Sequence, residues 1–312
     1  MFELTLSDCA DNNENAFSKG AAFIDGEFVP ISEAKLPLLD WGFIRGDANQ
    51  DTVSVWRGNF FRLEDHLTRF FRNIDDLRMV SPYSREDIAD VLHGLVRRSG
   101  LREAYVQMIM TRGLPPIGSR DPRTCVNRFQ AYCIPYVWIA RPEQQMEGLS
   151  MHVSNRWRVP AQSVSPRLKH YHWLDFEMSL FDGYDRDQQT ACCVNERGNV
   201  AEGPGFNIFA VFDGAVLTPE NGVLDGMTRR TVLELCDELK VPYKREEFSP
   251  DQMCSEATEV FLSTTSGGVI PVTSLDGQSV GSGKPGPITS ALHEAYWSKR
   301  ETGWHATPVA YQ

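Results

Sequence analysis

The sequence predicts a mixed α/β fold in two domains, and three observations carry this prediction. First, tight-turn signals and apolar runs alternate with amphipathic helical patterns in the first half of the chain. Second, residues 139–145 form a polar stretch with one proline, as expected of an interdomain linker. Third, a strand-rich run from Thr190 to Thr218 precedes further helical patterns. We therefore expect a small N-terminal domain over residues 1–138 and a larger domain over 146–312.

The first domain begins with hairpins and continues with helices. Asp25-Gly26 and Arg57-Gly58-Asn59 each separate two apolar runs, which is typical of tight hairpins. Apolar residues at helical spacing predict a helix over residues 64–79. A second helix is expected from Ser84, which starts a capping-box pattern, to Gly100. The remaining patterns predict strands over 104–110 and 129–138.

The second domain has a similar mixture of elements. A strand over residues 150–157 precedes the strand-rich run, and a helix is expected over 228–239. A strand over 258–263 then leads to a last helix over 288–299. No internal repeat stands out, so the chain is not expected to be a solenoid.

Composition and charge exclude several classes of function. Of the 312 residues, 41% are hydrophobic and 23% charged, as in ordinary globular proteins. The net charge of −11 argues against nucleic acid or an anionic membrane as the main partner, because both require clustered Lys and Arg. We expect neither a secretory signal at the N-terminus nor a membrane-spanning segment.

The seven cysteines predict a reducing compartment. Their number is odd and they form no CxxC pair, and neighbouring Cys192 and Cys193 would point to opposite faces of a strand. This pattern suits neither a zinc site nor a disulfide framework, so we expect reduced thiols in a cytoplasmic protein. We expect no metal site, because no HExxH or comparable spacing occurs.

Lys169 is the most distinctive candidate for chemistry. It stands in the segment Leu168-Lys169-His170-Tyr171-His172-Trp173, among aromatic and imidazole side chains. A lysine in such surroundings can have a lowered pKa and act as a nucleophilic amine. The alternative at this point is an exposed lysine whose stem stacks on a tryptophan.

Two turns are candidates for binding a phosphate. Residues 222–229 run from a strand to a helix N-terminus, where free N–H groups and the helix dipole favour an anion. Residues 264–268 read Thr-Thr-Ser-Gly-Gly after a strand. The alternatives are a simple helix cap at Thr228 and an ordinary turn. Residues 281–287 fail the ATP phosphate-loop pattern, since Gln278 replaces the first glycine and Lys284 precedes a proline.

These candidates together fit the chemistry of pyridoxal phosphate. That cofactor needs a lysine for a Schiff base and an acidic partner for its pyridine nitrogen. It also needs hydrogen-bond donors for its phosphate. Lys169, a carboxylate in a Gly-rich turn and the two turns would supply these groups.

At this point the chain resembles the class IV aminotransferases, which are pyridoxal-phosphate enzymes of fold type IV. The resemblance runs from about Gly20 to Trp297. It is carried by five segments in order: Glu202-Gly203-Pro204-Gly205-Phe206-Asn207, Asp213-Gly214, Thr218-Pro219, Gly226-Met227-Thr228-Arg229 and Thr264-Thr265-Ser266-Gly267-Gly268. The resemblance implies two α/β domains with the cofactor in the cleft between them. It also implies a homodimer in which partner loops close the site.

The resemblance implies a role for each residue that matches the family. Lys169 would be the Schiff-base lysine that carries a proton between Cα and C4′, and Glu202 would pair with the pyridine nitrogen. Arg69 would reach the phosphate, and Phe206 and Leu224 would enclose the ring. The remaining cofactor-binding residues would be Asn207, Met227, Thr228, Thr264 and Thr265.

Within the family, the chain resembles the (R)-selective amine transaminases most, through residues 47–66 and through Trp173. It departs from them at Arg45, where histidine is frequent, at Gln50, where an aromatic residue is usual, and at Thr52, where valine is frequent. Tyr105 matches the branched-chain enzymes, but Gln107 replaces the arginine they often carry. A keto-acid carboxylate favours an arginine. We expect Arg120, on a Gly/Pro-rich loop, to supply it, with Arg45 as the second candidate.

The expected function is transfer of an amino group from an (R)-amine or a D-amino acid to a keto acid such as pyruvate. The substrate pocket is expected to include Arg45, Gln50, Thr52, Tyr105, Arg120 and Trp173. The alternatives are an L-branched-chain aminotransferase and an aminodeoxychorismate-lyase-like enzyme on the same scaffold. A ligand-binding protein without activity is disfavoured, because both Lys169 and Glu202 are present.

Overall fold

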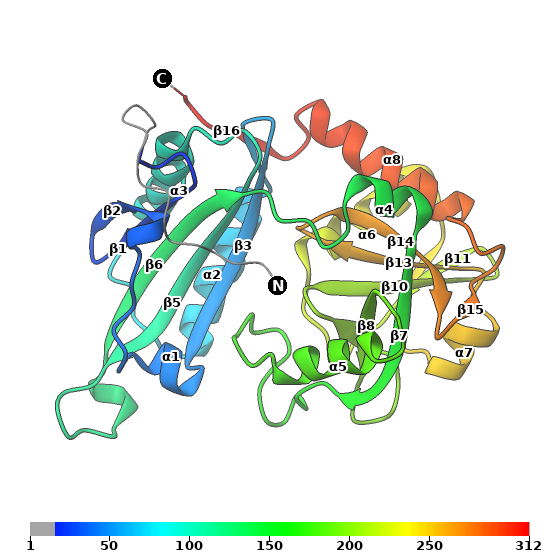
Figure 1. Ribbon diagram of the computed structural model, residues 1–312, viewed down its shortest axis with the longest axis horizontal. Helices are drawn as coiled ribbons and strands as arrows, with labels where there is room; N and C mark the ends of the chain where they lie inside the picture. Colours follow the sequence, from blue (N-terminus) through cyan, green and yellow to red (C-terminus); the bar gives the residue numbers. More distant parts are fainter. Residues whose placement is uncertain (1–15, 312) are drawn as a thin grey trace.

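The computed structural model describes residues 16–311, which form two sheets that lie side by side (Figure 1). The first sheet has the strand order β16-β4-β3-β5-β6-β1-β2, and its neighbouring strands are antiparallel. Its strands are β1 (Ala21–Ile24), β2 (Glu27–Pro30), β3 (Ala48–Trp56), β4 (Asn59–Phe61), β5 (Ala104–Leu114), β6 (Val126–Pro135) and β16 (Ala306–Pro308). Its helices are α1 (Trp41–Arg45), α2 (Leu63–Asp76) and α3 (Arg85–Ser99).

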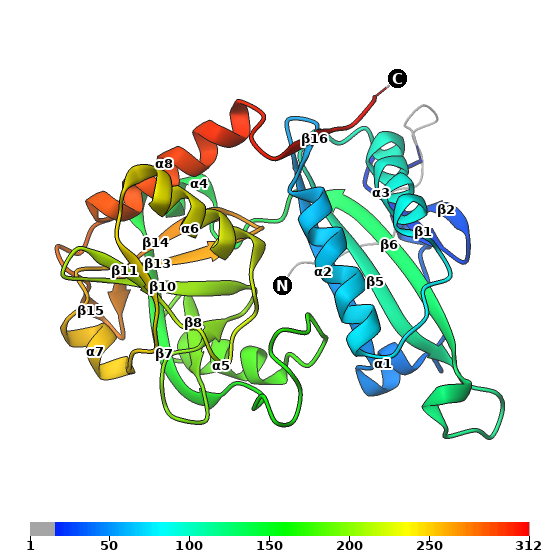
Figure 2. The same cartoon turned by 180° about the vertical axis from the view of Figure 1, so that it is seen from behind.

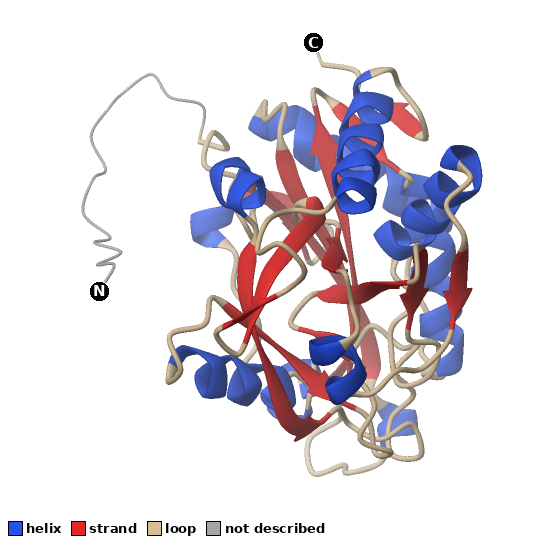
Figure 3. Ribbon diagram, turned by 90° about the vertical axis from the view of Figure 1, so that its right-hand side faces the viewer, coloured by secondary structure: helices blue, strands red, loops and turns tan. Residues whose placement is uncertain are grey.

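The second sheet has nine strands, and its main path runs β12-β11-β10-β13-β14-β7-β8. Its strands are β7 (Leu149–Trp157), β8 (Thr190–Val194), β9 (Glu202–Gly203), β10 (Phe206–Phe212), β11 (Ala215–Thr218), β12 (Tyr243–Arg245), β13 (Glu259–Thr264), β14 (Gly268–Leu275) and β15 (Gln278–Ser279). Its helices are α4 (Pro142–Glu147), α5 (Leu174–Tyr184), α6 (Met227–Leu239), α7 (Pro250–Ser255) and α8 (Pro287–Glu301). Strands lie in the centre of the molecule with helices around them (Figure 3).

Alternation along the first sheet separates a core face from a cleft face. Val53, Val106 and Met108 point to one face and are buried in a cluster beneath α2 and α3. Figure 2 shows both helices against this sheet. Side chains in a strand alternate between its two faces. Gln50 and Thr52, which lie three residues and one residue before Val53 on β3, therefore point to the opposite face. This face turns toward the second sheet and is polar.

The predicted turns and caps are confirmed where residue chemistry decides the conformation. Asp25 and Gly26 have φ of 54° and 87°, as the hairpin between β1 and β2 requires. Ser84 accepts a hydrogen bond from Asp87 N in the capping box of α3, and Gly100 ends that helix with φ of 71°. Local side-chain chemistry is sufficient to position these boundaries.

Three features differ from the sequence-based expectation. The strand expected over 129–138 ends at Pro135, and Tyr136 and Trp138 instead pack against Trp56 and Trp297. Residues 139–145 connect the two sheets, but their second half begins helix α4. The C-terminal strand β16 returns to pair with β4 of the first sheet.

No helix among residues 16–311 is long and apolar enough to cross a bilayer.

Arg62 joins the two sheets at the start of α2. Its guanidinium donates to Glu234 on α6 at 2.6 and 2.8 Å, to Thr231 at 3.1 Å and to Asp65 at 2.7 Å. The Arg62 side chain is only 2% exposed. A guanidinium buried this deeply needs such partners, so Arg62 holds α6 in a fixed position against α2.

Replacing Arg62 by Met is expected to lower the free energy of unfolding by about 2 kcal/mol, because Glu234 loses its buried partner and, among residues 16–311, keeps only the more exposed Arg230 and His305. Urea unfolding of the holoenzyme measures this. The control is Arg57→Met, whose pair with Glu301 is exposed (61% and 46%), so a change of at most about 1 kcal/mol is expected. Equal effects of the two variants would show that Arg62 does not fasten the domains.

Candidate active site

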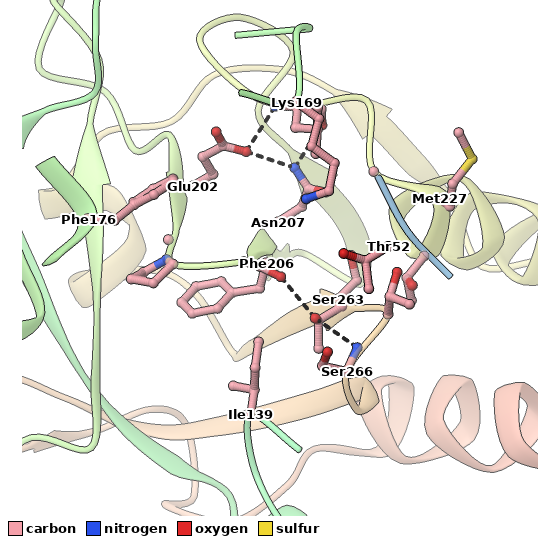
Figure 4. Close-up of a pocket in the computed structure, with 18 of the residues that line it drawn as sticks. Thr52, Ile139, Lys169, Phe176, Glu202, Phe206, Asn207, Met227, Ser263 and Ser266 are labelled. Carbon is pink, nitrogen blue, oxygen red and sulfur yellow. Dashed lines mark hydrogen bonds between the residues drawn. The ribbon is translucent and has the colours of Figure 1, made fainter. Parts of the chain in front are cut away.

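A cavity of about 340 Å³ lies between the two sheets. Its walls come from β3, β5, the segment 166–173, the β9–β10 hairpin, the turn before α6 and the end of β13. It brings together fourteen of the sixteen residues that the sequence singled out: Gln50, Thr52, Arg69, Tyr105, Lys169, Trp173, Glu202, Phe206, Asn207, Leu224, Met227, Thr228, Thr264 and Thr265. Figure 4 shows Lys169, Glu202 and Asn207 close together, with Ser263 and Ser266 on the other side of Phe206.

Lys169 extends into this cavity from a segment without helix or strand. Its carbonyl oxygen accepts a hydrogen bond from Gln50 N at 2.9 Å, and the next residue, His170, forms an isolated bridge with Asn49. These contacts dock the segment onto β3. Burial, and then the positive charge of Arg69, lower the pKa of Lys169 to about 8. The unprotonated fraction of its amine near neutral pH is therefore far larger than that of an ordinary lysine.

Glu202 is held in the β9–β10 hairpin beside Lys169. Its Oε2 accepts hydrogen bonds from Leu224 N at 2.9 Å and from Asn207 Nδ2 at 3.4 Å, and its Oε1 accepts one from Arg158 Nε at 3.1 Å. Burial raises the pKa of Glu202, and Arg158 opposes this. Gly203 permits the tight hairpin, since a Cβ there would lie 2.2 Å from the Phe206 ring.

Arg158 is a site residue that the sequence did not reveal. It lines the cavity just after β7, and it pairs with Asp175 as well as with Glu202. Burial lowers the pKa of Arg158, but the two carboxylates outweigh it and raise the pKa overall. Arg158 lies in a short basic and aromatic run without a motif, so no pattern could have identified it.

Arg69 reaches the cavity from α2 and contacts both sheets. Its Nε and Nη2 donate to Asp51 on β3, each at 2.7 Å, and its Nη1 donates to the Asp225 carbonyl, also at 2.7 Å. Asp51 is fully buried and also contacts His66 at 2.8 Å. Burial favours a neutral Asp51, but Arg69 and His66 outweigh it and hold the pKa of this carboxyl well below its usual range.

The donors around the start of α6 fit a phosphate group. Gly226 is the N-cap of α6 without a side-chain cap, so the first N–H groups of the helix are available at the cavity wall. Thr228, Thr264 and Thr265 line the same cavity, and Arg69 adds a positive charge to it. Thr264 Oγ1 donates to the Gly205 carbonyl at 2.9 Å and accepts from Ser266 N at 3.1 Å.

A planar ring also fits between these groups and Glu202. Phe206 and Leu224 line the same cavity and would supply its apolar contacts. Asn207 Nδ2 donates to the Leu224 carbonyl at 2.9 Å, which fixes the turn. Gly226 approaches Asn207 closely, because a Cβ on Gly226 would lie 2.0 Å from Asn207 Oδ1. The chemistry of this donor set therefore matches pyridoxal phosphate: an amine, a carboxylate, apolar ring contacts and phosphate donors.

Two predicted substrate residues lie outside the cavity of the single chain. Arg45 stacks on Trp41, with its guanidinium carbon 3.4 Å from the ring centroid. Arg120 is exposed on the loop between β5 and β6. Among the residues described, no group of three or more His, Cys, Asp and Glu side chains is arranged to hold a metal ion.

Comparisons with known proteins agree with this geometry. A family model described as amino-transferase class IV matches residues 50–275. A putative branched-chain-amino-acid aminotransferase of Methanocaldococcus jannaschii is 28% identical over 284 residues, which cover 90% of this chain and 96% of the relative. The D-alanine aminotransferase of Staphylococcus haemolyticus is 28% identical over 286 residues, which cover 88% and 95%.

Solved structures show the same fold. The branched-chain amino acid aminotransferase of T.th. with pyridoxamine 5'-phosphate superposes with a TM-score of 0.86 at 26% identity, covering 94% of this chain and 99% of that one. The same enzyme is known with N-(5'-phosphopyridoxyl)-L-glutamate, also at a TM-score of 0.86. The family match spans more than half of the sequence. The chain therefore belongs to the class IV aminotransferases, the aminotransferases of fold type IV that use pyridoxal phosphate.

Proposed function

We propose that this aminotransferase moves an amino group from an (R)-amine without a carboxylate, or from a D-amino acid, to a keto acid such as pyruvate. Lys169 is the amine that binds the cofactor and moves a proton at the substrate carbon. Glu202 faces the pyridine nitrogen, and Arg69, Met227, Thr228, Thr264 and Thr265 hold the phosphate. We further propose that the enzyme acts as a cytoplasmic homodimer.

Lys169 and Glu202 have different roles in the proposed reaction. Bound pyridoxal phosphate supplies an aldehyde that takes up the amino group and a ring that accepts the electron pair of the broken C–H bond. The lowered pKa of Lys169 suits a group that must both give and take a proton near neutral pH. Glu202, supported by Arg158 and Asn207, favours a protonated ring nitrogen.

The distribution of charge in the cavity supports an amino donor that has no carboxylate. The arginines that line it are already engaged: Arg69 pairs with Asp51, and Arg158 pairs with Glu202 and Asp175. The wall formed by Gln50, Thr52, Tyr105 and Trp173 carries no charge. A carboxylate against this wall would lose its hydration without a free arginine in exchange. An amine without a carboxylate avoids that cost, and relatives named D-alanine aminotransferase support the D-amino acid option.

The keto-acid acceptor still needs a partner for its carboxylate, and the proposed dimer offers a source. Exposed apolar side chains occur on α5 and around α1, as expected of surfaces that a second copy covers. They are Leu38, Leu39, Phe43, Ile44, Leu174, Met178, Phe181 and Tyr184. Arg120 lies on an exposed loop, where it could reach the cavity of a second copy, with Arg45 as the second candidate.

A second candidate function is L-branched-chain transamination. It is favoured by the match to the branched-chain aminotransferase of T.th. and by Tyr105, which lines the cavity. Lyase chemistry on an aminochorismate is the third option on the same scaffold. It would differ from both transaminations because pyruvate forms without any amino acceptor.

The visible spectrum of the holoenzyme distinguishes these functions. We expect (R)-1-phenylethylamine to bleach the yellow colour, because the uncharged wall accepts a donor without a carboxylate. We expect D-alanine to bleach it too, in line with the relatives named D-alanine aminotransferase. L-leucine should leave the colour in place, and the Lys169→Ala protein serves as the control that does not turn over. Bleaching by L-leucine alone would assign the chain to the branched-chain group.

Capture of the cofactor by the apoenzyme should depend on pH with a midpoint of about 8, the lowered pKa of Lys169. The neutral amine is the reactive form, so the capture rate rises as the pH increases through this value. Stopped-flow absorbance measures the rate, and a blocked lysine in solution reports the pH dependence of pyridoxal phosphate itself. A midpoint near that of an ordinary lysine would show that the cavity does not activate Lys169.

Glu202→Gln should keep the cofactor but lower kcat by about 10²-fold or more, because a neutral amide no longer stabilises a positive ring nitrogen. Steady-state kinetics and cofactor absorbance on the same sample separate the two effects. Glu220→Gln is the control, since Glu220 pairs with Arg229 at 3.2 Å and does not line the cavity. Unchanged turnover in Glu202→Gln would refute the proposed role of Glu202.

A further inference from the structure

The cleft face of the first sheet carries a row of uncharged polar side chains across three strands. Thr52 on β3 lies opposite Gln107 on β5, and Gln107 lies opposite Tyr132 on β6. Gln50 and Tyr105 are two residues along β3 and β5 from this row, so they share its face. Gln50, Thr52 and Gln107 are buried.

Gln107 stands at the centre of a hydrogen-bond relay. Its Nε2 donates to Gln50 Oε1 at 2.7 Å and to the Tyr171 hydroxyl at 3.1 Å. Its Oε1 accepts a hydrogen bond from the Tyr132 hydroxyl. Both protons of the Gln107 amide nitrogen are therefore engaged by its neighbours, and Gln107 itself does not line the cavity.

This relay decides which end of the Gln50 amide the cavity meets. Since Oε1 of Gln50 accepts the hydrogen bond from Gln107 Nε2, the Nε2 donor of Gln50 is left over. No partner for that nitrogen occurs among residues 16–311, and Gln50 lines the cavity. The backbone N–H of Gln50 binds the Lys169 carbonyl at 2.9 Å, so this amide lies beside the reactive lysine segment.

Tyr105 supplies a second uncharged donor on the same wall. Its hydroxyl lies 3.3 Å from Thr52 Oγ1, which donates to it, and this leaves its own proton free for the cavity. Burial raises the pKa of Tyr105, so the phenol stays protonated at neutral pH. A further buried arginine near this face, Arg300, donates to Ser54 and Tyr296 and does not line the cavity.

We propose that Gln107 is a positioning residue that orients the Gln50 amide, so that Gln50 and Tyr105 bind an uncharged acceptor oxygen in the side group of the amino donor. The substrate class is an amine or amino acid with an ether, carbonyl or hydroxyl oxygen near the amino-bearing carbon. A second carboxylate is disfavoured, because it would be desolvated without a cation. This inference rests on the proposed role of Lys169 as the reacting amine.

Substrate pairs that differ only by an ether oxygen in place of a methylene test this proposal. One pair is (R)-1-methoxypropan-2-amine and (R)-pentan-2-amine, and the other is O-methylserine and norvaline, each as the D- and the L-form. An ether oxygen only accepts hydrogen bonds, so it reports donors in the wall. We expect kcat/KM to favour the ether member by about tenfold in the wild-type holoenzyme.

Three variants separate positioning from a structural role. Gln107→Met removes the relay and should bring the ether preference close to one, while kcat for the methylene substrate stays within about twofold. Gln107→Glu accepts from Gln50 Nε2, turns the Gln50 oxygen toward the cavity and should favour the methylene member. Gln130→Met is the matched control: Gln130 is buried on the same face opposite Ile109, outside the relay, and should keep the wild-type preference.

An ether preference near one in the wild type, or an unchanged preference in Gln107→Met, would overturn the proposal. These results are independent of the donor class. If only the L-amino acid pair reacts, the proposed (R)-amine or D-amino acid function fails, but the ratio within that pair still measures recognition of the oxygen. If the amines react without an ether preference, the donor class stands and the role of Gln107 fails.

Discussion

The site depends on the buried contacts of Arg69 between the two sheets. The guanidinium of this α2 residue binds Asp51 on β3 with two nitrogens and the Asp225 carbonyl before α6 with the third. A charge buried this deeply is stable only with such partners. The contact therefore fixes the spacing between the first sheet and the start of α6, where the proposed phosphate donors lie. Arg62, at the start of α2, donates to Glu234 on α6 and so makes a second contact between these two helices.

The pairing of the other charges follows the same rule and shapes the chemistry. Each arginine that lines the cavity has a carboxylate partner, so Lys169 remains as the cation without one among residues 16–311 that line it. Its amine lies close to Arg69, which disfavours the protonated form. Opposite these charges the wall is uncharged, and in our proposal hydrogen-bond directions rather than ion pairs distinguish one substrate from another. The cavity thus has a charged half that suits the cofactor and a neutral half that suits the donor.

Local signals are sufficient for much of the fold, but not for contacts between distant segments. The Asp25-Gly26 hairpin and the capped helix α3 follow from residues within one turn of each boundary. Helix α5 is missing from the sequence-based expectation, although Leu174, Met178 and Phe181 recur at helical spacing, and these side chains are exposed in the single chain. Strand β16 could not be predicted either, since three residues gain their structure only by pairing with β4.

The same division holds for the site. Lys169, Glu202 and Thr228 stand in short motifs, so sequence alone could single them out. Asp51, Arg158 and Gln107 lie in strands or beside them, and their importance comes from partners that are 18, 44 and 57 residues away. A polar side chain inside an otherwise apolar strand is a weak signal of such a role. Arg120 and Arg45 stand out in the sequence by their charge, and one chain does not bring them to the cavity.

Reduction of the holoenzyme with sodium borohydride, followed by tryptic peptide mapping, tests most directly whether Lys169 is the reacting amine. The reduction fixes the cofactor to the lysine that holds it. The phosphopyridoxyl mass is expected in the peptide from Leu168 to Arg186, with cleavage after Lys169 blocked. The same mass on Lys19, Lys35, Lys240, Lys244, Lys284 or Lys299 would contradict the assignment of the site.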